Sequence, residues 1–288
     1  MKRLFAILLT VLLLAGCTAA VYDGPTVTQW VLAEEHTTHY DPDTGETHTT
    51  LDTYSYDSCG NQVRWCSYEG DELTYEARYT YDDQGNCLRE VTYERFWLFL
   101  LPTSRTYCTY DDQGRTLDTI YRNGLGIKTG EEHFTRDDEA NTLTWDSTYD
   151  TQTIYFDENG DVIRTETLSK PAGILTETVD EYDELGRTIK TVEYMDGDLF
   201  STTEYRYDNE GRLAEMTSYG RNGQILSGFT MLYEDNTITT LYRDGHKQVE
   251  TLRPDGRLHT EELYSSTGKL RRQSEYTYKL IQIPAEEE

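Results

Sequence analysis

Basic residues are scarce in this 288-residue chain. Lys and Arg together number 26, against 53 Asp and Glu, so the formal net charge is −27. A nucleic-acid-binding protein needs a positive surface to displace counterions from phosphate, and this balance argues against that class. It argues equally against a polybasic membrane-surface protein. We therefore expect no nucleic-acid partner.

Aliphatic residues are also few, because hydrophobic residues make up only 36% of the chain and 24 of them are Tyr. So little apolar content disfavours a thick globular core, while the many aromatic rings disfavour disorder. The sequence also lacks a Gly-x-Ser-x-Gly elbow, a phosphate-binding loop and a dinucleotide fingerprint. These absences predict a protein that is not an enzyme and needs no cofactor.

The N-terminus carries the one long apolar run. Lys2 and Arg3 precede an apolar stretch over residues 4–14, which is typical of a secretory signal peptide and short for a spanning helix. The run ends in Leu14-Ala15-Gly16-Cys17, which resembles the lipobox of bacterial lipoproteins. The resemblance implies cleavage between Gly16 and Cys17 and a diacylglyceryl group on the Cys17 thiol. The alternative is an ordinary signal peptide with an incidental Cys.

Lipidation would divide the chain into four parts. We expect a signal peptide over 1–16, a lipidated N-terminus and flexible tether over 17–28, a repeat array over 29–280 and an acidic tail over 281–288. Two acyl chains anchor a protein stably, whereas one binds only marginally. The expected location is the bacterial cell envelope, on the outward-facing side of a membrane that the protein contacts through its lipid.

The body repeats one phrase, Tyr-Asp-x-x-Gly followed by Asn or Arg. Five copies begin at Tyr56, Tyr81, Tyr110, Tyr182 and Tyr207, and a variant begins at Phe156. Asp accepts hydrogen bonds from nearby backbone N–H groups, and Gly supplies the positive φ that closes a turn. The turn-forming pairs are Asp57 and Gly60, Asp82 and Gly85, Asp111 and Gly114, Asp157 and Gly160, Asp183 and Gly186, and Asp208 and Gly211.

Second turn signals lie between these phrases, at Asn123-Gly124, Asp196-Gly197, Asn222-Gly223 and Asp244-Gly245. Asn-Gly and Asp-Gly favour two-residue hairpins, and the flanks are rich in Thr, Tyr, Val and Ile, which suit strands. Each unit therefore predicts strand, turn, strand, turn. The expected fold is all-β: an antiparallel β-meander of such repeats, forming an extended, twisted or curled sheet with a thin core.

The motif Tyr-Asp-x-x-Gly-Arg-Leu at residues 207–213 resembles the YD repeat of the RHS family, and the resemblance covers roughly residues 50–280. Known members wind such repeats into a hollow shell, often around a toxin or other cargo. This chain has too few repeats for a closed shell and ends at Glu288 without room for a toxin domain. The resemblance therefore implies the strand-turn architecture without toxin encapsulation.

Four cysteines lie outside the lipobox, an even number in an exported chain. If a hairpin is centred between residues 97 and 98, Cys87 and Cys108 are equidistant from its centre. We therefore predict a Cys87–Cys108 disulfide, with no assignment for Cys59 and Cys66. The alternative is that all four thiols are free.

The stretch Phe96-Trp97-Leu98-Phe99-Leu100-Leu101 is the densest apolar cluster in the repeat array. At the tip of a hairpin it either fills a local core or forms an exposed contact patch, with Phe96, Trp97 and Phe99 as its large side chains. In the second case its partner is a protein or a lipid.

Metal sites are not expected. His36 and His39 lie three residues apart in strand-like sequence, which places them on opposite faces. Residues 41–46 loosely resemble the start of a calcium loop but lack the later ligands, so an Asp-capped turn is favoured.

These observations favour a lipid-anchored surface protein acting as a non-enzymatic structural or interaction scaffold, with a protein or a cell-wall glycan as its partner. The alternative is a cell-wall or carbohydrate-binding module, because residues 154–160 resemble one arm of aromatic cell-wall-binding repeats.

Overall fold

The computed structural model describes residues 26–41 and 43–284, which form an all-β fold. The strands are β1 (Thr26–Tyr40), β2 (Thr47–Tyr56), β3 (Gln62–Glu69), β4 (Glu72–Tyr81), β5 (Cys87–Phe96), β6 (Phe99–Tyr110), β7 (Thr116–Asn123), β8 (Lys128–Asp137), β9 (Thr142–Ser147), β10 (Asp150–Phe156), β11 (Val162–Ser169), β12 (Ile174–Tyr182), β13 (Thr188–Met195), β14 (Asp198–Tyr207), β15 (Leu213–Gly220), β16 (Ile225–Glu234), β17 (Thr237–Tyr242), β18 (Lys247–Leu252), β19 (Leu258–Tyr264) and β20 (Leu270–Pro284).

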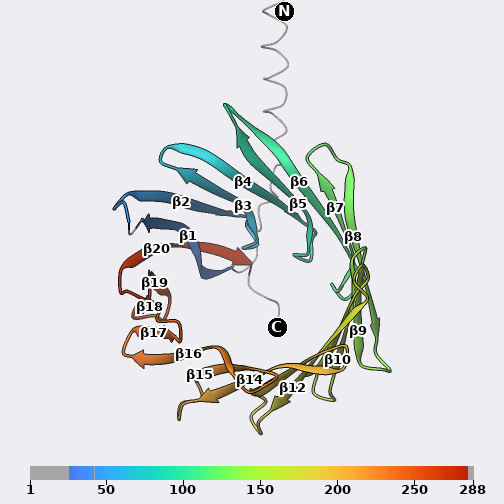
Figure 1. The fold of residues 1–288 in the computed structure, drawn as a ribbon. Helices are drawn as coiled ribbons and strands as arrows, with labels where there is room; N and C mark the ends of the chain where they lie inside the picture. The colour runs from blue at the N-terminus through green and yellow to red at the C-terminus, as the bar shows by residue number, and fades with distance from the viewer. Residues whose placement is uncertain (1–25, 42, 285–288) are drawn as a thin grey trace, which may run out of the picture.

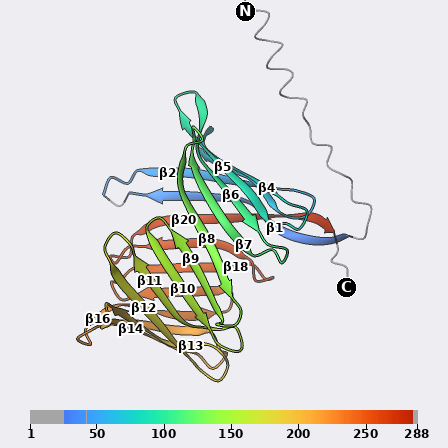
Figure 2. The ribbon, with the colours of Figure 1, turned by 90° about the vertical axis from the view of Figure 1, so that its right-hand side faces the viewer.

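The sheet closes on itself. Each strand pairs antiparallel with the next, and β20 pairs with β1 from Thr26 opposite Pro284 to His39 opposite Arg272. Figure 1 shows the resulting ring, viewed down its open centre, and Figure 2 shows the strands from the side. The expected antiparallel meander is confirmed, but the expectation that the repeats are too few to close is wrong.

Regular β-bulges accompany the curvature. Next to the Asp82 turn, Thr80 lies opposite Arg89 and Tyr81 opposite Cys87, so Leu88 has no partner. The same shift occurs immediately before the aromatic residue of the other copies of the phrase. A bulge bends its strand and increases the local twist. Repetition of this bend along the chain brings the first and last strands together and leaves neither as a free edge.

The repeated turns share one hydrogen-bonding pattern. Asp183 Oδ1 accepts the N–H groups of Leu185 at 2.9 Å and Arg187 at 3.0 Å, while Arg187 Nε donates to Asp183 Oδ2 at 2.7 Å. Gly186 has φ 74°, a conformation that residues with a Cβ rarely adopt. The same aspartate-to-backbone bonds occur at Asp57, Asp82, Asp111, Asp157 and Asp208.

Tyrosine takes the place of aliphatic core residues. The Tyr207 hydroxyl donates to the Thr188 carbonyl at 2.7 Å, and the Arg187 guanidinium lies 4.4 Å from the Tyr207 ring centre. Each such contact joins a turn to the strand of the neighbouring repeat. Equivalent hydroxyl bonds are made by Tyr81, Tyr110, Tyr182 and Tyr233. The core is correspondingly thin: among the described residues the buried hydrophobic side chains are Val31, Cys66, Ala77, Val91 and Val192.

The sheet is slightly longer than the expected array, because residues 26–28 belong to β1 and residues 281–284 belong to β20. The lipobox and Cys17 lie outside the described residues. Within the described part of the chain, no helix has the length and apolar character needed to cross a membrane.

The predicted disulfide is not formed. The hairpin is centred where expected, with Phe96 opposite Phe99, but a bulge between Thr92 and Tyr93 shifts the register by one residue. Arg89 therefore lies opposite Tyr107, and Cys87 and Cys108 do not face each other directly. Both thiols are free, as are those of Cys59 and Cys66, and burial raises the pKa of the Cys87 thiol.

Candidate functional site: the apolar rim

The meander gives the ring two different rims. Turns that follow even-numbered strands lie at the end where β1 begins and β20 ends, which we call the termini rim. Turns that follow odd-numbered strands lie at the opposite end, the far rim. All six Tyr/Phe-Asp-x-x-Gly turns fall on the termini rim, and the Asn-Gly and Asp-Gly turns fall on the far rim. Strands of about ten residues separate the rims by roughly 33 Å.

Exposed apolar side chains gather on the far rim. Of the eleven large apolar side chains that are more than half exposed in the described chain, nine lie in or beside its turns. They are Phe96, Trp97, Leu98, Phe99, Leu125, Ile127, Tyr149, Phe200 and Leu226, and the two elsewhere are Leu185 and Leu280. An accumulation of exposed apolar side chains at one end of a molecule is typical of a contact surface.

The β5–β6 hairpin projects beyond its neighbours (Figure 2). Its last pairs, Arg95 with Leu100 and Phe96 with Phe99, form a two-stranded ribbon, because β4 pairs with β5 only as far as Glu94 and β7 pairs with β6 only from Ser104 onward. Trp97 sits at the apex with φ 59°. Phe96, Trp97, Leu98 and Phe99 are 65–82% exposed, so this cluster is an exposed patch and fills no local core.

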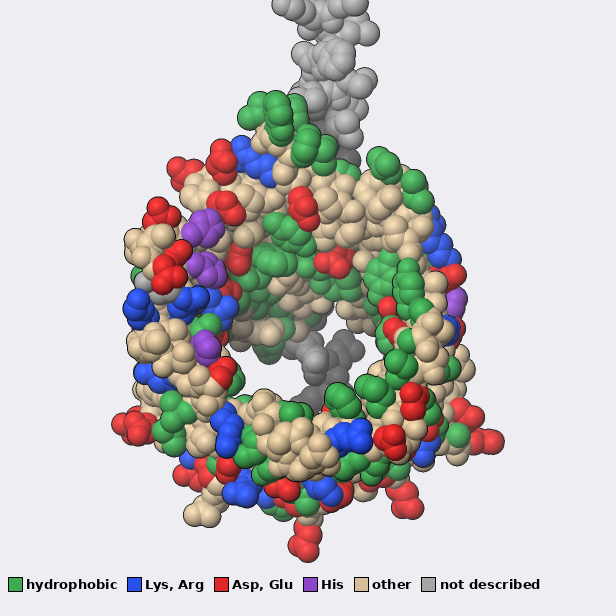
Figure 3. All heavy atoms as spheres, in the orientation of Figure 1, with side chains coloured by type: hydrophobic (Ala, Val, Ile, Leu, Met, Phe, Trp, Pro, Cys, Tyr) green, Lys and Arg blue, Asp and Glu red, His purple; other side chains and the backbone are tan. Residues whose placement is uncertain are grey.

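A second apolar turn lies beside this ribbon. The Gly124 backbone approaches β6 so closely that a Cβ on Gly124 would lie 1.7 Å from the Pro102 carbonyl oxygen. Arg105 also donates to the Gly124 carbonyl at 3.3 Å. These contacts hold Leu125 and Ile127, which are 87% and 60% exposed, next to the base of the ribbon. Figure 3 shows hydrophobic side chains on both hairpin ends at the upper edge of the ring.

The ends of the two hairpins, residues 95–110 and 119–130, contain no acidic residue. The four longest acid-free runs in the described chain are 95–110, 119–130, 216–233 and 263–274, and each contains a far-rim turn. An arginine side chain contacts the backbone of each apolar turn. Arg95 Nε donates to the Trp97 carbonyl at 2.7 Å, and Arg122 donates to the Gly126 carbonyl at 2.9 Å. Both guanidinium groups therefore brace the turn backbones, while the apolar side chains point to solvent.

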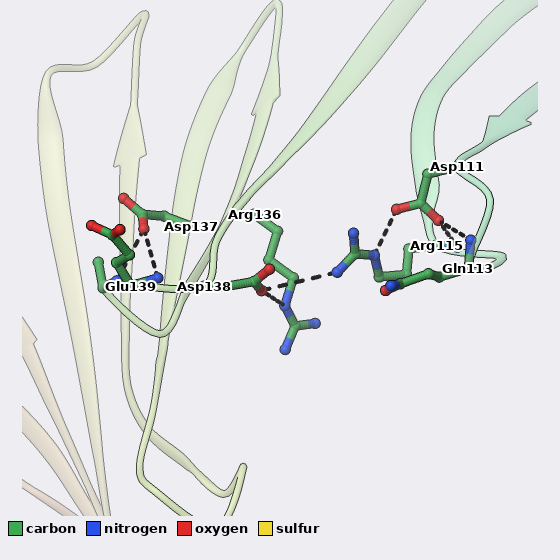
Figure 4. A network of polar contacts seen from close by, with 8 residues as sticks. Asp111, Gln113, Arg115, Arg136, Asp137, Asp138 and Glu139 are labelled. Atoms are coloured by element: carbon green, nitrogen blue, oxygen red, sulfur yellow. Dashed lines mark hydrogen bonds and ion pairs between the residues drawn. The ribbon is translucent and has the colours of Figure 1, made fainter.

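The termini rim is strongly acidic in contrast. Figure 4 shows one part of it, where Arg115 Nε donates to Asp111 at 2.6 Å and Arg115 Nη1 lies 3.9 Å from Asp138 Oδ1. Arg136 donates to the same Asp138 carboxylate at 3.1 Å. Hydrogen bonds from the Arg115 backbone and side chain hold the pKa of Asp111 below its usual range. These arginines neutralise carboxylates of their own rim, so the network is structural.

One such turn gives a pH prediction. The Arg257 side chain and backbone N–H lower the pKa of Asp255 from 3.8 to about 2. A lowered folded-state pKa means that the ionised carboxylate stabilises the fold above pH 4, and this stabilisation is lost as the pH falls through about 2. Asp255→Asn is therefore expected to lower the melting temperature at pH 7. The difference from wild type should shrink to nothing near pH 2 in thermal scans followed by circular dichroism. A difference that is constant with pH would contradict this assignment.

The remaining residues singled out in the sequence lie on β1 and in the far-rim turn that follows it. Asp41 caps its own turn by accepting the N–H groups of Asp43 at 2.8 Å and Thr44 at 3.0 Å. His36 and His39 are both exposed on β1. Among the described residues, no group of three or more His, Cys, Asp and Glu side chains is arranged to hold a metal ion.

The aromatic pair of the carbohydrate-binding alternative is engaged within the chain. The Arg164 guanidinium lies 4.3 Å from the Tyr155 ring centre, and Arg136 lies 5.6 Å from that of Phe156. The Tyr155 hydroxyl also donates to Glu166 at 2.8 Å. Guanidinium stacking therefore occupies one face of each ring that a sugar would otherwise contact.

Sequence reasoning missed Leu125 and Ile127 as contact residues. The available signal was the order of the turns: in a meander every second turn lies at the same end, so residues 97–98 and 124–127 had to share a rim. The isolated tripeptide Leu-Gly-Ile carries no such information, because its neighbours in space come from a different hairpin.

No protein-family model and no curated protein matches the chain. Solved structures do match at low identity. The TcdB2-TccC3 structure aligns over 90% of this chain and 15% of its own, at 12% identity and a TM-score of 0.45. A porin-like protein from Bacteroides uniformis aligns over 86% and 96%, at 12% identity and 0.30. A Bacteroides fragilis protein of unknown function aligns over 53% and 87%, at 16% identity and 0.17. This chain spans about a seventh of the first of these.

Proposed function

We propose that this protein is a lipid-anchored repeat protein of the bacterial envelope, of RHS/YD type, that acts as a non-enzymatic interaction scaffold. Its contact surface is the far rim, and the β5–β6 apex is the main part of that surface. The observation that carries the proposal is the exposure of Phe96, Trp97, Leu98 and Phe99 on a projecting ribbon in an otherwise polar chain. Such an apolar patch is a liability in water unless it has a partner.

The anchor and the contact surface would lie at opposite ends of the ring. Cys17 precedes Thr26 by nine residues, which span at most about 32 Å when fully extended. Thr26 begins β1 at the termini rim. The lipid would therefore hold the acidic termini rim toward its own membrane and turn the apolar rim away from it.

The anchoring half of the proposal is tested by metabolic labelling with an alkyne-tagged fatty acid. The native chain is expected to take up the label and to fractionate with membranes. Cys17→Ser should lose the label and be released, whereas the matched variant Cys59→Ser, at an exposed turn cysteine, should retain both properties. Label on the Cys17→Ser chain, or none on the native chain, would refute lipidation at this residue.

A further inference from the structure

The shape of the apolar apex points to a lipid surface as its partner. A protein partner of a convex ribbon must supply a groove, and residues 96–99 at the apex lie beyond the last strand pairs with β4 and with β7. A bilayer needs no such complement, because apolar side chains at a turn can enter it while the polar backbone behind them stays at the headgroups. Trp, which the apex supplies at Trp97, favours that boundary.

Charge supports the same partner. Arg95, Arg105, Arg122 and Lys128 lie in the two acid-free runs that bear the apices, which places a cationic collar behind the apolar tips. Lys128 pairs with Glu131 and Arg95 with Glu72 at 3.0 Å, so part of this charge is compensated. The termini rim lies roughly 33 Å away, several Debye lengths at physiological salt, so its carboxylates scarcely repel a surface at the far rim. The carboxylates that oppose the collar are those of the far rim itself, such as Asp71 and Glu72.

We propose that the paired apices at residues 96–99 and 124–127 insert into a lipid surface, with headgroup phosphates bound by the cationic collar. The inference deepens the proposed function by naming the partner of the far rim. Together with the anchor at Cys17, it makes the ring a spacer with a lipid contact at each end. The far-rim contact itself depends on the described residues alone and does not need the anchor.

The experiment uses a chain that begins at residue 17 and carries Cys17→Ser, so that no acyl group contributes. This chain keeps every described strand, because the closed sheet starts at Thr26. Binding is measured by flotation with phosphatidylcholine vesicles, with and without phosphatidylglycerol. Quenching of tryptophan fluorescence by brominated lipid reports depth, since Trp97 is 82% exposed.

We expect binding that is stronger with phosphatidylglycerol and quenching that is lost with Trp97→Ser. The double variant Trp97→Ser/Phe99→Ser should weaken partitioning by about 100-fold, because two large side chains no longer leave water. The matched control is Leu185→Ser, which removes an equally exposed leucine from the termini rim. It should change partitioning by less than about twofold. All three variants should melt like wild type, because the substituted side chains are exposed.

The proposal is overturned if the unlipidated chain does not bind either vesicle, or if Leu185→Ser and the apex variant bind alike. If vesicles are not bound but the apex captures a protein on cells, the lipid partner is wrong and the scaffold function stands. If vesicles are bound but Cys17 carries no lipid, the anchor is wrong and the far-rim contact stands.

Discussion

Ser274→Pro is expected to open the ring and lower the melting temperature by roughly 10 °C. Ser274 lies in the middle of the β1–β20 seam, opposite Thr37, and only 1% of it is exposed. The two hydroxyl groups are 2.7 Å apart. Proline removes the backbone donor and this hydroxyl pair from a buried strand position, at a cost of about 3–5 kcal/mol. Loss of the seam would also free two strand edges, so we expect amide protection to fall in β1 and β20 together.

The chain offers a matched proline control at a turn. Asp112 follows Asp111 at the position that Pro254 occupies after Arg253, and both turns are closed by a glycine N–H bonded to the first residue of the turn, at 3.0 Å and 2.9 Å. Proline suits that position of a turn. Asp112→Pro should therefore leave the melting temperature within a few degrees of wild type. Equal losses from Ser274→Pro and Asp112→Pro would show that the seam does not hold the ring closed.

Glu76→Ala is expected to lower the free energy of unfolding by about 2–4 kcal/mol. Glu76 is 1% exposed on β4 and accepts hydrogen bonds from Arg64 Nε at 2.6 Å and Arg78 Nε at 2.7 Å. Burial alone raises the pKa of Glu76, but the bonds from Arg78 and Arg64 outweigh it and hold the pKa below its usual range. Removal of the carboxylate leaves two guanidinium groups beside a void. Both are about half exposed, and their partial hydration keeps the loss below that of a fully buried pair.

The comparison for Glu76 is an exposed ion pair of the same chemistry. Glu181 bonds Lys190 at 2.7 Å, and the two side chains are 51% and 36% exposed. Glu181→Ala should cost no more than about 1 kcal/mol in urea unfolding, because exposed pairs are screened by water. Comparable losses for Glu76→Ala and Glu181→Ala would contradict a structural role for the buried carboxylate.

Local chemistry in the sequence was sufficient for the strands and turns. Asp183 and Gly186 act through contacts within four residues, so the phrase that contains them predicts its own geometry. The same holds for the hairpin centre between Trp97 and Leu98, which apolar residues bracket on both sides.

The closure of the ring and the strand register depend on the combined effect of many bulges, which no single segment of the sequence shows. Each bulge, such as the one at Leu88, adds a small twist, and only the total over all strands brings β20 to β1. A bulge at Thr92 and Tyr93 likewise shifts Cys87 against Cys108 by one residue. The contact of Glu76 on β4 with Arg64 on β3 likewise depends on strand register and could not be predicted from the sequence neighbours of Glu76.

The central claim is that the far rim, and not the termini rim, is the contact surface. Its most direct test places a photoreactive amino acid at position 98 or, in a separate chain, at position 185, of the chain that begins at residue 17 with Cys17→Ser, mixed with phosphatidylglycerol-containing vesicles or with isolated cell envelopes. Leu98 is 82% exposed and Leu185 76%, so the two probes are equally accessible on opposite rims. We predict abundant cross-links to lipid or partner from position 98 and few from position 185. Equal cross-linking from both positions, or cross-links from position 185 alone, would contradict the account.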